Sequence, residues 1–175
     1  LKPYQVLDTL FYDDFENFHQ DDTIVDDQQL RIDSVKYKYW SLGANSVVRR
    51  WVVDGHLELE SYERGTYTIP FNVNIPDSVD FEIKTNMVIP GGNSGMMSFY
   101  WGGSSLKDMY AIIVNQDGYT SIGQVSHGVV VAKSDVNIYN DVYNEIVIRK
   151  SGAFYYIFIN GRLIDNLKFE GLKGN

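Results

Sequence analysis

The sequence predicts an all-β fold in which two antiparallel sheets pack face to face as a sandwich. No stretch has an apolar stripe with helical periodicity, whereas apolar or alternating runs of about five to eight residues recur between turn signals. The 175 residues include 13 Tyr and 9 Phe, which fit the pleated surface of a sheet. This length and a hydrophobic content of 44% suit one domain, so we expect residues 1–175 to form a single unit.

The expected strands follow one another at intervals of about ten residues, a spacing typical of sandwiches and barrels. In chain order they are Val47–Val53, His56–Tyr62, Thr66–Val73, Asp80–Ile89, Gly95–Trp101, Met109–Asn115, Tyr119–Gln124, Gly128–Lys133, Asn144–Lys150, Ala153–Asn160 and Arg162–Phe169. The run FYYIFI at 154–159 is apolar on both faces, which predicts a central strand. We expect its core-facing set to be Tyr155, Ile157 and Ile159, with the set Phe154, Tyr156 and Phe158 partly covered.

Tight turns are marked by the dipeptides Asp54-Gly55, Asp117-Gly118, Ser151-Gly152 and Asn160-Gly161. One or both residues of each pair accept a positive φ, which tight hairpins require. These hairpins predict an antiparallel meander. At Asn160-Gly161 a slip of one residue would turn every side chain of both strands to the wrong face, so this pair fixes the register.

The first part of the chain differs from the rest. Residues 13–38 are rich in Asp and poor in paired apolar residues, which indicates long loops around one or two short strands. Residues 1–10 are interpreted as a linker or an edge strand. Irregular loops often carry function. Asp13 and Asp14 are candidate ligands of a structural Ca²⁺, because oxygen-rich loops suit that ion; the alternative is a solvated acidic loop. No other cofactor is expected.

Composition and charge exclude several classes of protein. A net charge of −8 and a pI near 4.7 argue against a nucleic-acid partner, which requires Lys and Arg to neutralise phosphates. No run approaches the roughly 20 apolar residues of a membrane span. The absence of Cys removes disulfides and thiolate chemistry. The chain begins with Leu1 rather than Met, as after removal of a leader or in a piece of a longer protein, and we favour an extracellular, periplasmic or cell-surface location over the cytoplasm.

Motifs spread over residues 11–175 resemble the concanavalin A-like lectin and glucanase superfamily. They are Tyr12-Asp13-Asp14-Phe15, the isolated Trp40, Val53–Leu59, Asp80–Ile83, Gly92–Gly95, Tyr143–Ile148 and Phe158–Ile164. Within the superfamily they look most like bacterial laminin-G-like and 3-keto-disaccharide-hydrolase-like domains. The resemblance implies a jelly-roll sandwich. It also implies a further strand after Gly171–Asn175, so the final strand is expected to be missing after residue 175.

The same resemblance indicates which segments would carry catalytic residues. Glucanases of this superfamily carry three acids on one strand as Glu-x-Asp-x-(x)-Glu, and residues two apart share a face at about 6.6 Å. Glu58, Glu60 and Glu63 have similar offsets, but the middle acid is Glu, and exposed acids on an antiparallel strand are the ordinary alternative. The hydrolase branch carries a Tyr-Glu-Val-Gln-like strand, whose matching segment Tyr110–Val114 is apolar at those positions. We therefore expect a non-catalytic domain, with a glycoside hydrolase as the alternative.

Sugar recognition needs an aromatic surface and a few fixed polar partners. The candidate ligand-binding residues are Tyr39, Trp40, Asn93, Tyr100 and Trp101. Trp101 alternates with Met97 and Phe99, which predicts the core, but it also precedes a Gly-rich turn, which predicts the rim. The leading hypothesis is a lectin-like module of a larger protein that binds a glycan or polysaccharide. The second hypothesis is a laminin-G-like domain that binds a protein partner.

Overall fold

The structure is a computed structural model that describes residues 43–53, 56–61, 75, 78–89, 96–103, 108–125, 128–133 and 135–168. The chain divides into two compact units, Leu1–Asn72 and Val73–Asn175. The single-domain interpretation stays a prediction. The described residues form antiparallel strands and contain no α-helix, so the all-β prediction is confirmed for this part of the chain. Segment 1–10 and residues 171–175 lie outside it.

The first unit contains a three-stranded antiparallel sheet in the order β1-β2-β3. Its strands are β1 (Gly43–Ala44), β2 (Val48–Val53) and β3 (His56–Ser61). The turn between β1 and β2 is closed by Asn45, whose Oδ1 accepts the N–H groups of Val47 and Val48 at 2.8 and 2.9 Å. Asn stabilises turns in this way because its short side chain reaches the backbone two residues ahead.

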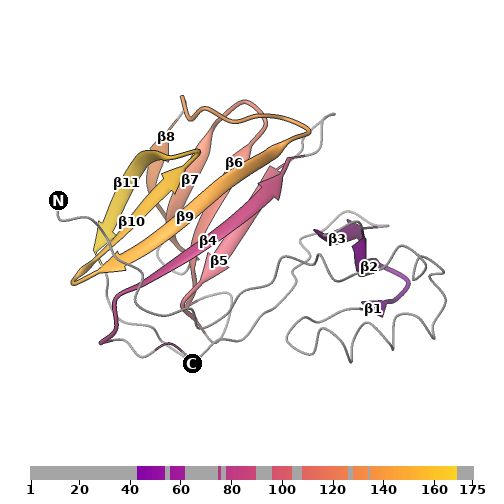
Figure 1. Cartoon of the computed structure of the whole chain (residues 1–175), viewed down its shortest axis with the longest axis horizontal. Coiled ribbons are helices and arrows are strands. Elements are labelled where there is room, and N and C mark those ends of the chain that lie inside the picture. Colours follow the sequence, from indigo (N-terminus) through magenta and orange to yellow (C-terminus); the bar gives the residue numbers. More distant parts are fainter. Residues whose placement is uncertain are drawn as a thin grey trace. The chain divides into compact units, whose positions relative to one another are not determined.

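The second unit contains two four-stranded antiparallel sheets, and Figure 1 labels their strands. One sheet has the order β11-β10-β9-β4, with β4 (Phe81–Val88), β9 (Tyr143–Ser151), β10 (Phe154–Ile159) and β11 (Arg162–Lys168). The other has the order β5-β6-β7-β8, with β5 (Met96–Trp101), β6 (Tyr110–Asn115), β7 (Thr120–Gln124) and β8 (Gly128–Lys133). Consecutive strands are neighbours from β5 to β8 and from β9 to β11, which confirms the meander in these parts.

The observed strands β2 to β11 agree with the predicted ones to within one residue at each end. The agreement follows from the turns. Gly118, Gly152 and Gly161 have φ values of 80°, 56° and 75°, and Asn160 has a φ of 49°. Both residues of Asn160-Gly161 are therefore left-handed, as a two-residue type I′ hairpin requires. The predicted strand Thr66–Val73 and the predicted turn Asp54-Gly55 lie outside the described residues.

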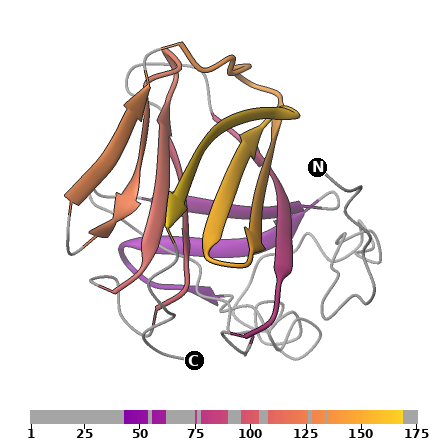
Figure 2. The same ribbon diagram turned by 90° about the vertical axis from the view of Figure 1, so that its left-hand side faces the viewer.

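The two sheets of the second unit form separate layers, which Figure 2 shows from the side. Their inner faces share one core, to which the first sheet contributes Phe81, Ile146, Ile148, Tyr155, Ile157, Ile159 and Leu167, and the second Met97, Trp101, Tyr110, Ile112, Val114 and Ile122. The ring of Tyr155 lies 5.0 Å from that of Tyr110 and 5.7 Å from that of Trp101, centre to centre. Burial of such rings removes large apolar areas from water and holds the layers together. The unit is thus β-sandwich-like.

Strand β10 confirms the predicted direction of FYYIFI. Tyr155 and Ile157 are fully buried and Ile159 is 1% exposed, whereas Tyr156 and Phe158 are half-buried and Phe154 is 40% exposed. The reason is the pleat, which sends successive side chains to opposite faces. One set fills the core, and the other lies on the outer face of the sheet.

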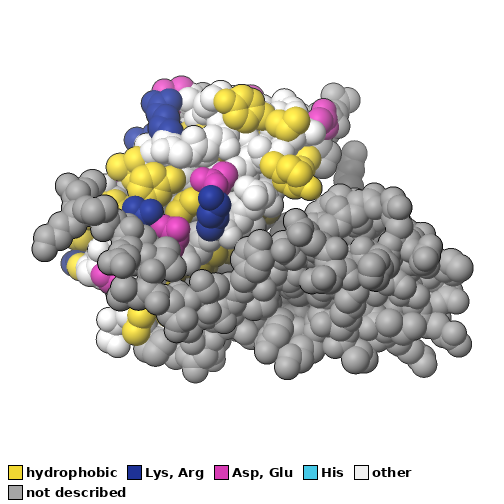
Figure 3. All heavy atoms as spheres, viewed as in Figure 1, with side chains coloured by type: hydrophobic (Ala, Val, Ile, Leu, Met, Phe, Trp, Pro, Cys, Tyr) yellow, Lys and Arg dark blue, Asp and Glu magenta, His cyan; other side chains and the backbone are white. Residues whose placement is uncertain are grey.

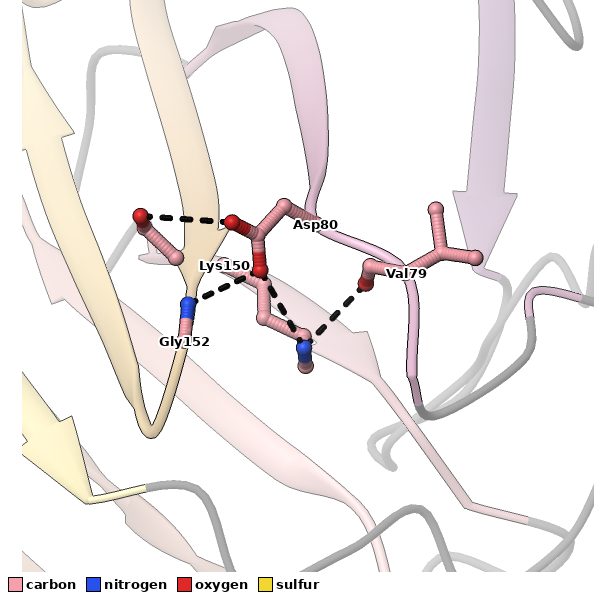
Figure 4. Close-up of polar contacts among 5 residues, drawn as sticks. Val79, Asp80, Lys150 and Gly152 are labelled. Atoms are coloured by element: carbon pink, nitrogen blue, oxygen red, sulfur yellow. Dashed lines mark hydrogen bonds and ion pairs between the residues drawn. The ribbon is translucent and has the colours of Figure 1, made fainter.

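Polar contacts fix the ends of the strands. Lys133 on β8 pairs with Asp165 on β11 at 3.2 Å, which joins the edge strands of the two sheets. At the start of β4, Asp80 accepts the N–H of Gly152 at 2.8 Å and pairs with the ammonium of Lys150 at 3.5 Å (Figure 4). The Lys150 side chain is 3% exposed, and its Nζ also donates to the carbonyl of Val79 at 3.1 Å. A buried ammonium needs such oxygen partners, so these contacts hold β4 against the β9–β10 turn.

Candidate functional site

The two candidate aromatic residues of β5 lie on opposite faces of its sheet. Trp101 is 5% exposed and stacks on Tyr110 at 5.8 Å between ring centres, so the core alternative is the one that the structure favours. Its indole has little surface to offer a ligand. Tyr100, the neighbouring residue, is half-buried and points to the outer face of the β5–β8 sheet.

Among the other candidate residues, the structure describes only Glu58 and Glu60. Glu58 and Glu60 lie on β3, opposite Trp51 and Arg49 in the strand register. Glu63, Tyr39, Trp40, Asn93, Asp13 and Asp14 lie outside the described residues. The proposed roles of all these residues stay predictions.

On the outer face of β5, β6 and β7, the two rows that contain Ala111 and Ile113 consist mostly of small side chains. In the register, Tyr100 lies opposite Ala111, and Ala111 lies opposite Gly123. In the next row, Ser98 lies opposite Ile113, and Ile113 lies opposite Ser121. No carboxylate lies in these two rows of β5, β6 and β7, so they lack the acids that sugar chemistry requires.

The outer face of the other sheet has a different character. Phe154, Tyr156 and Phe158 follow one another along β10, and the rings of Phe154 and Tyr156 are 6.4 Å apart. On the neighbouring strands, Arg149 lies opposite both Tyr156 and Glu82, and Lys84 lies opposite Val147. We call this surface the aromatic face: Phe154, Tyr156 and Phe158 with Glu82, Lys84, Glu145 and Arg149. In Figure 3, which views this sheet from outside, hydrophobic side chains lie beside paired basic and acidic ones.

An ion pair fixes the polar part of the aromatic face. Arg149 donates from Nε and from a terminal nitrogen to the same oxygen of Glu82, Oε2, at 2.8 and 2.6 Å. The centre of its guanidinium also lies 5.3 Å from the ring centre of Phe158, within the range of a cation–π contact. The two contacts hold the guanidinium plane in place, so aromatic and charged groups form one ordered surface.

Lys84 and Glu145 form a second ion pair on this face. The hydrogen bond to Glu145 and the opposite charge of that residue raise the pKa of Lys84 above its ordinary value of 10.5. Because the pKa of Lys84 is raised in the folded state, this ion pair stabilises the fold. Its stabilisation is complete below the unfolded-state pKa of Lys84 and is lost as the pH rises through the folded-state pKa.

We expect Lys84→Met to change the free energy of unfolding only slightly at neutral pH, because the Lys84 side chain is 57% exposed. The difference between this variant and the wild type should vanish as the pH rises above the pKa of Lys84. Urea unfolding across the alkaline range measures it. A stability difference that grows with pH would contradict the assignment.

The end of the aromatic face is bordered by exposed apolar side chains. Tyr143, opposite Val88 in the register, is 56% exposed, and Val142 and Tyr139 are 52% and 48% exposed. The fully buried Asn144 holds their segment in shape: its Oδ1 accepts the N–H of Tyr139 at 2.9 Å, and its Nδ2 donates to the carbonyl of Tyr139 at 2.7 Å. The exposed tyrosines are therefore presented on an ordered backbone.

Two searches of the described residues, for clustered metal ligands and for membrane-spanning helices, are negative. These contain no group of three or more His, Asp or Glu side chains placed to hold a metal ion, and no helix among them has the length and hydrophobicity to cross a membrane. The predicted calcium ligands Asp13 and Asp14 are outside this part of the chain, so that site stays a prediction.

Sequence reasoning placed the candidate site in the early loops and around Trp101, and it missed the aromatic face. The signal was present in FYYIFI, because period-two alternation puts half of its side chains on the outer face. What the alternation could not supply was the partner strand: Glu82 and Arg149 are 67 residues apart in sequence.

Comparisons of the chain with protein-family models, with curated proteins and with solved structures found no match.

Proposed function

We propose that the protein is a non-catalytic carbohydrate-binding module that takes a glycan chain on the aromatic face. The observation that carries the proposal is the row Phe154, Tyr156 and Phe158 beside the Arg149–Glu82 ion pair. Pyranose rings have an apolar face that packs on aromatic rings, and their hydroxyls bond to fixed charged groups. A concanavalin A-like jelly roll, which the sequence motifs resemble, would suit this role, as would an extracellular, periplasmic or cell-surface location.

The geometry favours an extended ligand over a single sugar. Side chains that share a face of a strand repeat at about 6.6 Å, and the Phe154 and Tyr156 rings are 6.4 Å apart, so a ligand lying along β10 would meet one ring after another. The Arg149 bonds use only Oε2 of Glu82, so Oε1 is the oxygen that we assign to a sugar hydroxyl. Because the rings and the ion pair are held by the sheet, little ordering entropy would oppose binding.

The test is retention of the protein in native gels that contain neutral polysaccharides, followed by calorimetry with oligosaccharides of the polysaccharide that retards it most. We expect Tyr156→Ala to weaken binding by about thirtyfold, as for a central aromatic contact worth roughly 2 kcal/mol. Tyr119→Ala is the matched control, because Tyr119 is 42% exposed but lies in the β6–β7 turn. Absence of retardation by every polysaccharide, or equal binding by the two variants, would refute the proposal.

A protein partner is the second candidate, and the exposed group Val88, Tyr139, Val142 and Tyr143 favours it. Exposed apolar patches with tyrosines are typical of protein-binding surfaces. The two candidate functions, glycan binding and protein binding, should depend on different residues. Glycan binding should depend on Tyr156 and survive Tyr143→Ser, whereas binding of a protein at this end of the sheet should show the reverse dependence.

A further inference from the structure

The turn that joins β10 to β11 has a chemical property beyond its role in the fold. In an Asn-Gly pair, the backbone nitrogen of Gly can attack the side-chain amide of the preceding Asn, because Gly has no side chain to hinder the approach. Asn160-Gly161 is the Asn-Gly pair of this sequence. The question is whether the fold permits this reaction.

The reaction needs only water as a co-reactant. The nitrogen of Gly161 forms a bond to Cγ of Asn160, the bond from Cγ to Nδ2 breaks, and ammonia leaves with the proton of the attacking nitrogen. Water then opens the resulting cyclic imide at either carbonyl. The product is aspartate, or isoaspartate with the chain running through the former side chain.

Both the oxygen and the nitrogen of the Asn160 side-chain amide form hydrogen bonds. Its Oδ1 accepts the N–H of Glu145 at 3.0 Å, and its Nδ2 donates to the carbonyl of Asn137 at 3.0 Å and to Oδ1 of Asn144 at 3.1 Å. Its own N–H donates to the carbonyl of Glu145 at 2.9 Å. Rotation of Cγ toward the nitrogen of Gly161 would break the side-chain hydrogen bonds together, so the bonds oppose the attack.

We propose that Asn160-Gly161 is a latent deamidation site that the folded chain keeps unreactive, and that its modification releases the segment of residues 137–143. A carboxylate at position 160 has no N–H, so its oxygen would face the carbonyl oxygen of Asn137 and Oδ1 of Asn144, both acceptors. Asn144 in turn holds Tyr139 and, through its Nδ2, the carbonyl of Val142 at 3.2 Å. The loss of hydrogen bonds at the turn therefore also affects the segment that carries the exposed Tyr139 and Tyr143.

The first test measures the reaction itself on the full chain. The folded protein and the same protein unfolded in urea are kept in mildly alkaline buffer at physiological temperature, and peptides that contain Asn160 are followed by mass spectrometry. We expect the amide to last at least about tenfold longer in the folded protein, since the side-chain hydrogen bonds of Asn160 must open first. Equal lifetimes would overturn the protection.

The second test introduces the product directly. Asn160→Asp should speed amide hydrogen exchange at Tyr139 by about tenfold, with exchange in β6 and β7 unchanged. Asn166→Asp is the matched control, because Asn166 lies exposed on β11 of the same hairpin and carries the same change of charge. Unchanged exchange in Asn160→Asp, or an equal increase in the control, would overturn the release. If Asn160→Asp does not fold, exchange is measured on wild-type protein aged until part of it is modified.

Discussion

Replacing Tyr155 with Ala is expected to lower the free energy of unfolding by about 3–5 kcal/mol, the range for truncation of a large buried aromatic side chain. Tyr155 is fully buried, and its ring meets Trp101 and Tyr110 on the opposite sheet and Phe81 at 6.1 Å on its own. The cavity would open between the two layers, where neither sheet can close it without moving whole strands. Because a domain of this size is stable by only about 5–15 kcal/mol, much of its stability should be lost.

Tyr156→Ala provides the control for this variant, with the same substitution one residue away on β10. Tyr156 is half-buried on the outer face, so its truncation leaves no core cavity and should cost about 1 kcal/mol or less. Unfolding in urea gives both values, with equal slopes expected if each variant unfolds in two states. The pair also separates stability from binding, since Tyr156→Ala should lose the ligand and Tyr155→Ala the fold. Similar losses of stability would show that the two faces of β10 are not distinct.

The fold was predictable because its determinants are local. Alternation along a strand and left-handed turn residues act within a few residues, and both are visible in the sequence. Trp101 is instructive: the Gly-rich turn after it suggested the rim, but its alternation with Met97 places it in the core. A pleated strand fixes the direction of each side chain, so alternation decided its place. The short β1 was missed, because two residues give no period.

The aromatic face was less predictable because it depends on pairing between distant segments. Both faces of FYYIFI looked covered, and only the sheet order shows that one face is the outer surface. The order also brings Arg149 between Tyr156 and Glu82, which no local pattern indicates. Side chains become a site when the register aligns them, and register between strands far apart in sequence is not encoded in a short motif.

Gly118→Ala is the second substitution expected to have a large effect, with a cost of about 2–5 kcal/mol. Gly118 has a φ of 80° in the turn between β6 and β7, and its N–H donates to the carbonyl of Asn115 at 3.0 Å. A side chain here would suffer the left-handed strain of any L-residue. In addition, its Cβ would overlap the backbone oxygen of Val136, whose side chain is buried in the core. Since this neighbour is backbone and not a flexible side chain, the overlap can be relieved only by moving the turn away from the core.

Gly152→Ala isolates the first of these two contributions. Gly152 also has a left-handed φ, 56°, but a Cβ there would meet no described atom within 4 Å. Its substitution should therefore cost only the conformational strain, about 1–2 kcal/mol. The difference in the free energy of unfolding between the two variants, measured in urea, then gives the energy of the contact between the β6–β7 turn and Val136. Equal costs would mean that this turn is not packed against Val136.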